Sequence, residues 1–143
     1  MAPIRVAIAG STGSIGGQTL EIISADPDAF DVVGLSTGRS AAVIIEQAKN
    51  FTPAIVAVAD PSARNEVSEA LSGLSEIEVV ADAKEMCDIA DVVINGVMGF
   101  AGLPVTMATL SNGRRLGLAN KESLIAAGPV VQPLREVDGA ELV

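Results

Sequence analysis

The sequence predicts an α/β fold in a single domain, with a doubly wound, mostly parallel sheet and helices on both of its faces. Short apolar runs alternate along the chain with longer amphipathic runs, as strands and helices do in such a sheet. Hydrophobic residues make up 49% of the chain and aromatic residues only 2%. The core must therefore consist of Val, Ile, Leu and Ala, as in parallel strands covered by helices. A length of 143 residues is enough for one domain with one core.

The stretch at residues 6–16, VAIAGSTGSIG, predicts the start of a nucleotide-binding fold. The apolar run Val6–Ala9 is expected to be a buried strand, and Gly10, Gly13 and Gly16 follow it. Glycine has no Cβ, so it allows a sharp turn and lets backbone N–H groups come close to a phosphate. Strand, glycine turn and helix in this order are the phosphate-binding part of such folds.

The helix after the glycines is expected at Gln18–Ser24, from the spacing of its apolar residues. Its N-terminus would add about half a positive charge near the turn. Ser11, Thr12 and Ser14 can donate hydroxyls to a ligand or cap the helix. The glycine spacing is G-x-x-G-x-x-G and not the familiar G-x-G-x-x-G. The stretch favours a phosphate site, and an ordinary strand-to-helix turn is the alternative.

The end of the second expected strand, Val32–Ser36, decides which dinucleotide would fit. A site for NAD places Asp or Glu there to bind the 2′-hydroxyl of the ribose, but residues 32–42 include no acid. Gly38 and Arg39 stand there instead, and a guanidinium binds a 2′-phosphate through charge-assisted hydrogen bonds. This favours NADP. The alternative is that Arg39 is a solvated charge at a helix start.

The rest of the chain continues the alternation. Further strands are expected at Ile55–Ala59, Glu78–Val80, Val92–Ile94 and Leu116–Ala119. Further helices are expected at Ala41–Asn50, Pro61–Ser72, Ala83–Cys87 and Pro104–Ser111. A weak helical pattern spans residues 130–137, and residues 140–143 read as the opening of another strand. Three glycines follow the fifth expected strand: Gly96, Gly99 and Gly102. They indicate either a ligand that passes close to the backbone or plain turns.

The run Asn120-Lys121-Glu122 follows a strand at its carboxyl end, the edge where parallel sheets bind ligands. A lysine there can hold a substrate phosphate or polarise a carbonyl. Asn120 can hydrogen-bond a ribose or an amide, and Glu122 could orient Lys121 or a ribose hydroxyl. The alternative is a helix start, with Asn120 as its cap and the other two residues on its surface.

Composition and charge exclude several classes of function. A net charge of −9 excludes a nucleic-acid partner. The chain has no histidine, so histidine acid–base catalysis and histidine metal ligands are excluded. Cys87 is the single cysteine and is expected to be a small core residue. The start MAPIR leads into a strand, and no run of about 18 apolar residues occurs. We therefore expect no membrane contact and a bacterial-type cytoplasmic protein without a targeting segment.

Three runs carry a resemblance to a known family: GSTGSIG at residues 10–16, LSTGRS at 35–40 and LANKESL at 118–124. Together they resemble the N-terminal domain of 1-deoxy-D-xylulose 5-phosphate reductoisomerase, over essentially the whole chain. The resemblance implies a Rossmann-like domain that binds NADPH. The cofactor contacts that it implies are Thr12, Gly13, Ser14, Ile15, Gly38, Arg39, Ser40, Asn120 and Glu122. Ser40 stands where many members carry asparagine, and Lys121 matches the substrate lysine of the family.

The resemblance also implies a reaction. The family isomerises and reduces 1-deoxy-D-xylulose 5-phosphate, a small phosphorylated sugar, to 2-C-methyl-D-erythritol 4-phosphate in non-mevalonate isoprenoid biosynthesis. It uses NADPH and a divalent metal, Mg or Mn. Its catalytic and C-terminal domains are expected to be absent from residues 1–143, and Asp138 and Glu141 do not match its metal ligands. We therefore expect no catalytic or metal-binding residue in this chain, and NADPH binding without turnover.

Two other readings stay open at this point. One is a stand-alone NADP-binding or interaction module without chemistry of its own. The other is an NADP-dependent dehydrogenase domain such as that of a homoserine dehydrogenase, against which LANKESL argues. Sheet edges or helix faces left bare could drive self-association into a homodimer.

Overall fold

In the described part of the chain, seven parallel strands form one sheet in the order β4-β3-β2-β1-β5-β6-β7. The structure, a computed structural model, describes residues 2–119 and 131–143. The strands are β1 (Ile4–Ala9), β2 (Phe30–Thr37), β3 (Ile55–Val58), β4 (Glu78–Val80), β5 (Val92–Asn95), β6 (Arg115–Leu118) and β7 (Glu141–Leu142). The strand order reverses between β1 and β5, so the sheet is doubly wound as predicted. Ligands bind at such a switch point, beyond the carboxyl ends of the strands.

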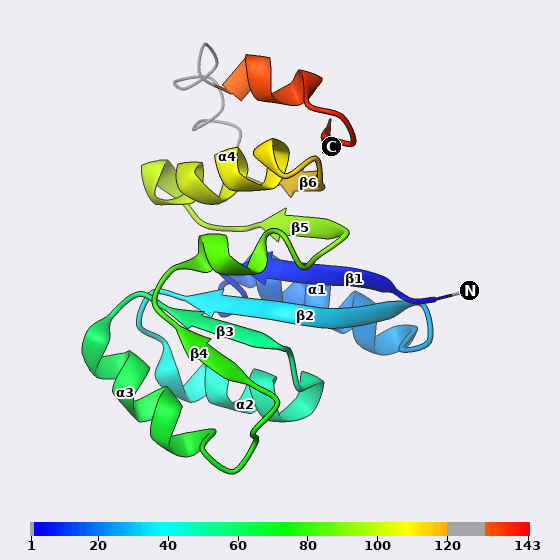
Figure 1. Ribbon diagram of the computed structural model, residues 1–143. Coiled ribbons are helices and arrows are strands. Elements are labelled where there is room, and N and C mark those ends of the chain that lie inside the picture. The colour runs from blue at the N-terminus through cyan, green and yellow to red at the C-terminus, as the bar shows by residue number, and fades with distance from the viewer. Residues whose placement is uncertain (1, 120–130) are drawn as a thin grey trace.

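Helices cover both faces of the sheet (Figure 1). The α-helices whose bounds the structure describes are α1 (Ser14–Ala25), α2 (Ala41–Phe51), α3 (Pro61–Ala70) and α4 (Leu103–Ser111). The 3-10 helices are η1 (Ala83–Met86), η2 (Gly99–Gly102) and η3 (Gln132–Glu136). α1, α2 and α3 pack on one face, and α4, η1 and η3 pack on the other. Among the described residues, no helix has the length and apolar character needed to span a bilayer.

The core lies in two layers, one on each face of the sheet. Successive side chains of β1 point to opposite faces, so Val6 and Ile8 join the layer under α1 and α2, while Ala7 joins the layer under α4. Met86 packs closely against Gly34 of β2. A Cβ added to Gly34 would lie 2.8 Å from the Met86 Cβ. The buried layers are almost wholly aliphatic, as the composition predicts.

The first helix begins at Ser14, earlier than the predicted Gln18. Apolar spacing cannot locate this start because the first turn carries Gly16 and Gly17, which have no side chains to form a pattern. The expected helix at residues 83–87 is the short 3-10 helix η1. The predicted final strand is confirmed as β7.

Cys87 is confirmed as a core residue, with no exposed surface. Burial among apolar side chains raises the pKa of its thiol. This keeps the thiol protonated and unreactive.

Candidate functional site

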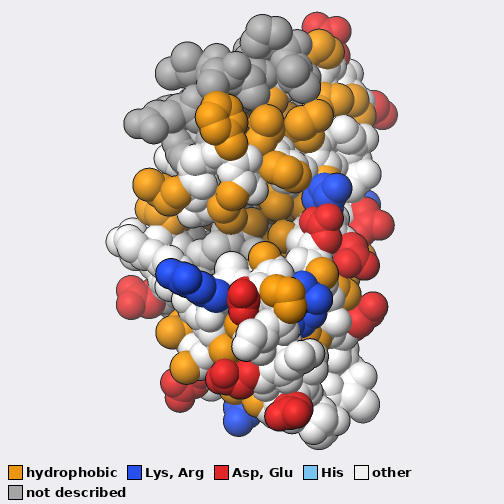
Figure 2. Space-filling model, turned by 90° about the vertical axis from the view of Figure 1, so that its left-hand side faces the viewer, with side chains coloured by type: hydrophobic (Ala, Val, Ile, Leu, Met, Phe, Trp, Pro, Cys, Tyr) orange, Lys and Arg blue, Asp and Glu red, His pale blue; other side chains and the backbone are white. Residues whose placement is uncertain are grey.

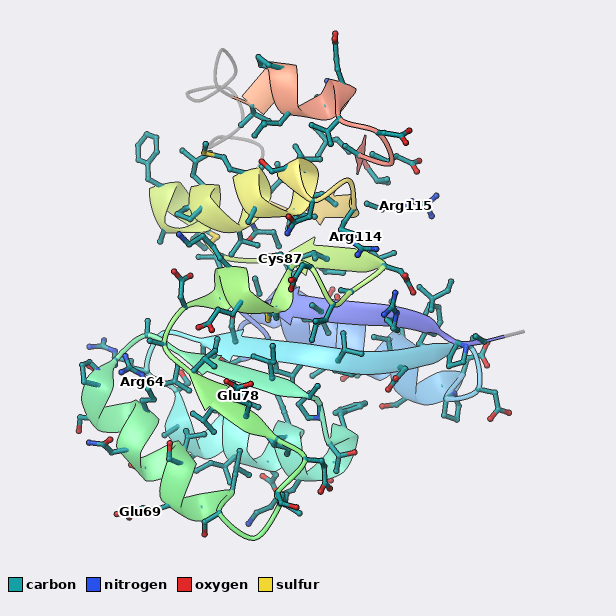
Figure 3. The ribbon with its side chains drawn as sticks, in the orientation of Figure 1. Arg64, Glu69, Glu78, Cys87, Arg114 and Arg115 are labelled. Atoms are coloured by element: carbon teal, nitrogen blue, oxygen red, sulfur yellow. The ribbon has the colours of Figure 1, made fainter. Side chains whose placement is uncertain are left out.

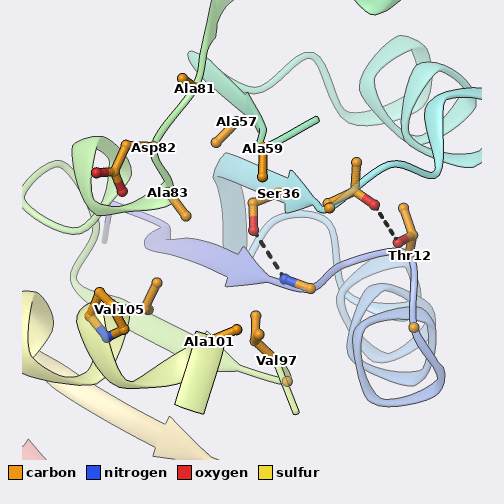
Figure 4. A pocket seen from close by; sticks show the side chains of 16 residues that line it. Thr12, Ser36, Ala57, Ala59, Ala81, Asp82, Ala83, Val97, Ala101 and Val105 are labelled. Atoms are coloured by element: carbon orange, nitrogen blue, oxygen red, sulfur yellow. Dashed lines mark hydrogen bonds between the residues drawn. The ribbon is translucent and has the colours of Figure 1, made fainter. Parts of the chain in front are cut away.

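A cavity of about 620 Å³ opens at the carboxyl edge of the sheet. Its walls are the last residues of β2 and β3, the residues that follow β1, β2, β3 and β4, the loop after β5 and the start of α4. Figure 2 looks onto this edge and shows hydrophobic side chains gathered above and within a hollow. Figure 4 shows the lining side chains, most of which are small. A cavity of this size is within the usual range for small-molecule and cofactor sites.

The turn after β1 requires glycine at two of its three positions. Gly10 has φ +73°, where side chains with a Cβ are strained, and a Cβ there would lie 3.2 Å from the Gly96 carbonyl carbon. A Cβ on Gly16 would lie 2.5–2.6 Å from the carbonyl of Ser11. At Gly13 a Cβ would meet only the Gly10 oxygen, at 3.5 Å. Gly10 and Gly16 therefore pack the turn tightly, whereas Gly13 leaves its outer side open.

The N-terminus of α1 points its free N–H groups toward the turn. Gly13 is the N-cap and no side chain caps the helix, so the suggested capping by Ser11, Thr12 or Ser14 is wrong. The first helical hydrogen bond runs from the Gly17 N–H to the Gly13 oxygen, at 2.9 Å. The three N–H groups before it belong to Ser14, Ile15 and Gly16. They have no backbone acceptor among the described residues. Free N–H groups at a helix N-terminus form an anion-binding site.

Two side chains that sequence reasoning missed hold the turn in place. Ser36 Oγ accepts a hydrogen bond from the Gly10 N–H at 3.0 Å (Figure 4). Gln47, from α2, donates to the Ser11 oxygen at 2.9 Å and accepts from Ser11 Oγ at 2.8 Å. Ser11 is fully buried, so these contacts satisfy its polar atoms. The available signal was the position of Gln47 beside Ala48 and Ile44, on the buried side of the second helix.

The residues after β2 form the second predicted contact region. Gly38, Arg39 and Ser40 are exposed at the rim of the cavity, and Gly38 lines it. In the described part of the chain, no side chain pairs with the Arg39 guanidinium. A Cβ on Gly38 would meet nothing within 4 Å. This loop thus presents an unpaired cation beside open space.

Other arginines are occupied or distant. Arg64, on α3, donates to the carbonyl oxygens of Val58 and Ala59 at 2.8 and 2.9 Å, and Figure 3 shows it at the carboxyl edge. Arg114 and Arg115 lie at the opposite edge, where β6 begins (Figure 3). Arg39 is therefore the cation best placed for an anion at the end of β2.

The loop after β5 owes its shape to Asn95, the last residue of that strand, to which the sequence analysis gave no role. Its side chain is fully buried and donates to the Gly102 oxygen at 2.8 Å. Its Oδ1 accepts from the Val97 N–H at 3.1 Å. A Cβ on Gly102 would lie 2.8 Å from the Val97 oxygen. Gly102 is thus a packing requirement of the loop, and the loop forms one wall of the cavity.

Three predicted contacts, Asn120, Lys121 and Glu122, lie outside the described residues. The preceding residue, Ala119, donates its N–H to the Asn95 oxygen at 3.2 Å. The chain therefore leaves β6 at the carboxyl edge, beside the loop after β5.

One ion pair lies away from the cavity. Arg5 and Asp91 form an ion pair at 2.8 Å, at the start of β1 and of β5. The hydrogen bonds from Arg5 lower the pKa of Asp91 to about 2. No group of three or more His, Cys, Asp or Glu residues that could hold a metal occurs among the described residues.

These features define a class of protein. A parallel sheet with a glycine turn and a free helix N-terminus at its switch point is a Rossmann-like dinucleotide-binding domain. The chain belongs to the 1-deoxy-D-xylulose 5-phosphate reductoisomerase family, whose model matches residues 6–128. The reductoisomerase of Thermosynechococcus vestitus is 44% identical over 140 residues, which cover 94% of this chain and 34% of that protein. The chain spans about a third of the length of the curated relatives that it matches.

Solved structures agree. The reductoisomerase from Zymomonas mobilis, in complex with NADPH, matches with a TM-score of 0.88 and 34% identity, over 99% of this chain and 38% of that one. A DOX-P reductoisomerase in complex with NADPH, fosmidomycin and magnesium matches with a TM-score of 0.89 and 29% identity, over 97% of this chain and 35% of that one. A putative homoserine dehydrogenase from Archaeoglobus fulgidus is 19% identical with a TM-score of 0.62, over 98% of this chain and 41% of that one. That likeness concerns the fold alone, so the homoserine dehydrogenase reading gains no support.

Proposed function

We propose that residues 1–143 form an NADPH-binding domain. In this proposal the N-terminus of α1 binds the pyrophosphate, through Thr12, Gly13, Ser14 and Ile15. The observation that carries the proposal is the set of N–H groups at that N-terminus, those of Ser14, Ile15 and Gly16, which have no backbone acceptor in the described chain. They directly follow Thr12 and Gly13, which line the cavity. Oxygens of a phosphate satisfy such groups, and the positive end of the helix favours their charge. Asn120 and Glu122 remain predicted contacts.

The choice of NADPH over NADH rests on Gly38, Arg39 and Ser40. A 2′-phosphate at the end of β2 would meet the Arg39 guanidinium, which has no competing partner among the described residues. Asp60, the nearest acid after β3, caps α3 by accepting from the Ala63 N–H at 2.9 Å. Its carboxylate is therefore engaged by that helix, and Asp60 is not among the residues that line the cavity.

The complete protein, we propose, is a reductoisomerase that converts 1-deoxy-D-xylulose 5-phosphate to 2-C-methyl-D-erythritol 4-phosphate. The bound NADPH would supply the hydride for the reduction. Lys121 is proposed to bind the substrate, and the divalent metal would be held by residues outside this chain. Residues 1–143 alone would then bind NADPH without turnover. A homodimer and a cytoplasmic location stay predictions.

The test is calorimetric titration of the 143-residue chain with NADPH and with NADH. We expect tighter binding of NADPH. Arg39→Asp should weaken NADPH by about 10- to 100-fold, the value of a charge-assisted hydrogen bond, and should leave NADH unchanged. Arg115→Asp makes the same charge change at the opposite edge and should affect neither cofactor. It also removes the exposed Arg115–Glu141 ion pair at 2.8 Å, so urea denaturation checks that this variant folds. Equal losses of NADPH and NADH on Arg39→Asp would contradict the 2′-phosphate contact, and no binding of either cofactor would contradict the cofactor domain.

A further inference from the structure

Three polar groups form a hydrogen-bonded series that joins the two proposed phosphate contacts. The Ser40 N–H donates to Thr37 Oγ1 at 3.2 Å, and Thr37 Oγ1 lies 2.8 Å from Thr12 Oγ1. Thr37 is buried at the end of β2, whereas Thr12 is half-buried after β1. Both residues line the cavity, and a dashed line in Figure 4 joins Thr12 to its partner. The hydrogen-bonded series thus starts at the Arg39 loop and ends at the glycine turn.

The backbone group at one end decides the direction of the hydrogen bonds. An amide N–H has no lone pair to offer, so Thr37 Oγ1 must accept from Ser40. The single proton of Thr37 then needs an acceptor. Apart from Thr12 Oγ1, no described residue provides one. The 2.8 Å contact allows either hydroxyl to donate, but if Thr12 donated, the proton of Thr37, which is only 6% exposed, would have no acceptor among the described residues. The arrangement that satisfies more groups within the protein has Thr37 donating to the less buried Thr12.

With Thr37 as its donor, Thr12 keeps its own proton free. That proton has the cavity in front of it, since Thr12 is a wall residue. We propose that Thr37 is a positioning residue: it fixes the Thr12 hydroxyl as a hydrogen-bond donor to an anionic oxygen of the bound cofactor. This inference rests on the proposed NADPH site and adds to it a residue outside the predicted contact set.

The arrangement strengthens the Thr12 hydroxyl as a donor and fixes its direction. Each donor in the series polarises the next one, so the Thr12 hydroxyl becomes a stronger donor than an isolated hydroxyl. Its bond to a charged phosphate oxygen is also charge-assisted. A fixed direction also removes the need to reorient a hydroxyl on binding. Thr37 thus acts through Thr12 and needs no contact with the ligand.

A double-mutant cycle on NADPH binding tests this inference. Thr12→Val should weaken NADPH by about tenfold, and Thr37→Val should weaken it by about threefold. Thr37→Val added to Thr12→Val should cause a smaller loss than Thr37→Val causes alone, because the donor that Thr37 positions is already gone and only the contact with the Ser40 N–H remains to be lost. Thr37→Ser keeps the hydroxyl and should bind as the unchanged chain does.

The control variant is Thr109→Val. Thr109 is a buried threonine on α4 that donates to the Val105 oxygen at 2.7 Å and does not line the cavity. It reports what the loss of a buried hydroxyl does to folding alone, and it should leave NADPH binding unchanged. Additive losses in the cycle, or a loss with Thr37→Ser equal to that with Thr37→Val, would overturn the inference while the proposed function stands. A chain that binds no NADPH before any substitution would overturn both.

Discussion

The change Gly16→Ala should destabilise the chain, although alanine is the better helix former. Gly16 lies in the first turn of α1, and alanine in place of glycine usually stabilises a helix by about 0.8–1 kcal/mol. Here the new Cβ would lie 2.5–2.6 Å from the Ser11 carbonyl. The backbone of Ser11 cannot move freely because Gln47 and Ser36 hold it. Overpacking of this kind costs about 1–3 kcal/mol, so we expect a net loss of about 0–2 kcal/mol.

The adjacent glycine offers a matched control. A Cβ on Gly17 would meet nothing within 4 Å, and Gly17 belongs to the same helix. Gly17→Ala should therefore stabilise the chain by up to about 1 kcal/mol. Urea denaturation of both variants gives the two free energies of unfolding. If Gly16→Ala were stabilised as much as Gly17→Ala, the tight packing of helix against turn would be refuted.

Two further predictions concern groups that hold the fold around the cavity. Gln47→Leu should reduce the free energy of unfolding by about 1–3 kcal/mol, because it leaves the buried Ser11 oxygen without a partner; unchanged urea denaturation would contradict this. Asp91→Asn should cost about 0.2–1 kcal/mol at neutral pH, the range for an exposed ion pair. Because the pKa of Asp91 is lowered from 3.8 to about 2, this difference should be fully present above pH 3.8 and should disappear as the pH falls through about 2. A difference that persists at still lower pH would contradict the ion-pair account.

Much of the fold could be predicted because its signals are local. Apolar runs located all the strands of the sheet, and Asp60-Pro61 marked the start of α3 correctly, with Asp60 as its N-cap. The start of α1 could not be predicted, because glycines carry no periodicity. The composition predicted an aliphatic core, but not the close approach of Met86 to Gly34, which depends on contacts between distant segments.

The predicted site residues were those that would face a ligand, and the supporting residues were missed. Gln47 forms a hydrogen bond to Ser11, which is distant in sequence. Asn95 forms a hydrogen bond to Gly102, at the end of the loop that follows it. The helical pattern could show that Gln47 lies on the buried side of α2, but neither it nor the strand pattern around Asn95 reveals the hydrogen-bond partner. Gly102 also shows this limit, since it packs against Val97 for reasons that need no ligand.

The central claim is that the free N-terminus of α1 and the Arg39 loop bind one NADPH molecule. An amide NMR titration of the isotope-labelled chain tests it most directly. We predict that NADPH shifts the signals of residues 13–16 and 38–40 most, and that NADH shifts the first group but hardly the second. Signals at the opposite edge, such as that of Arg115, should stay in place. Shifts centred on that opposite edge, with none at residues 13–16, would contradict the account.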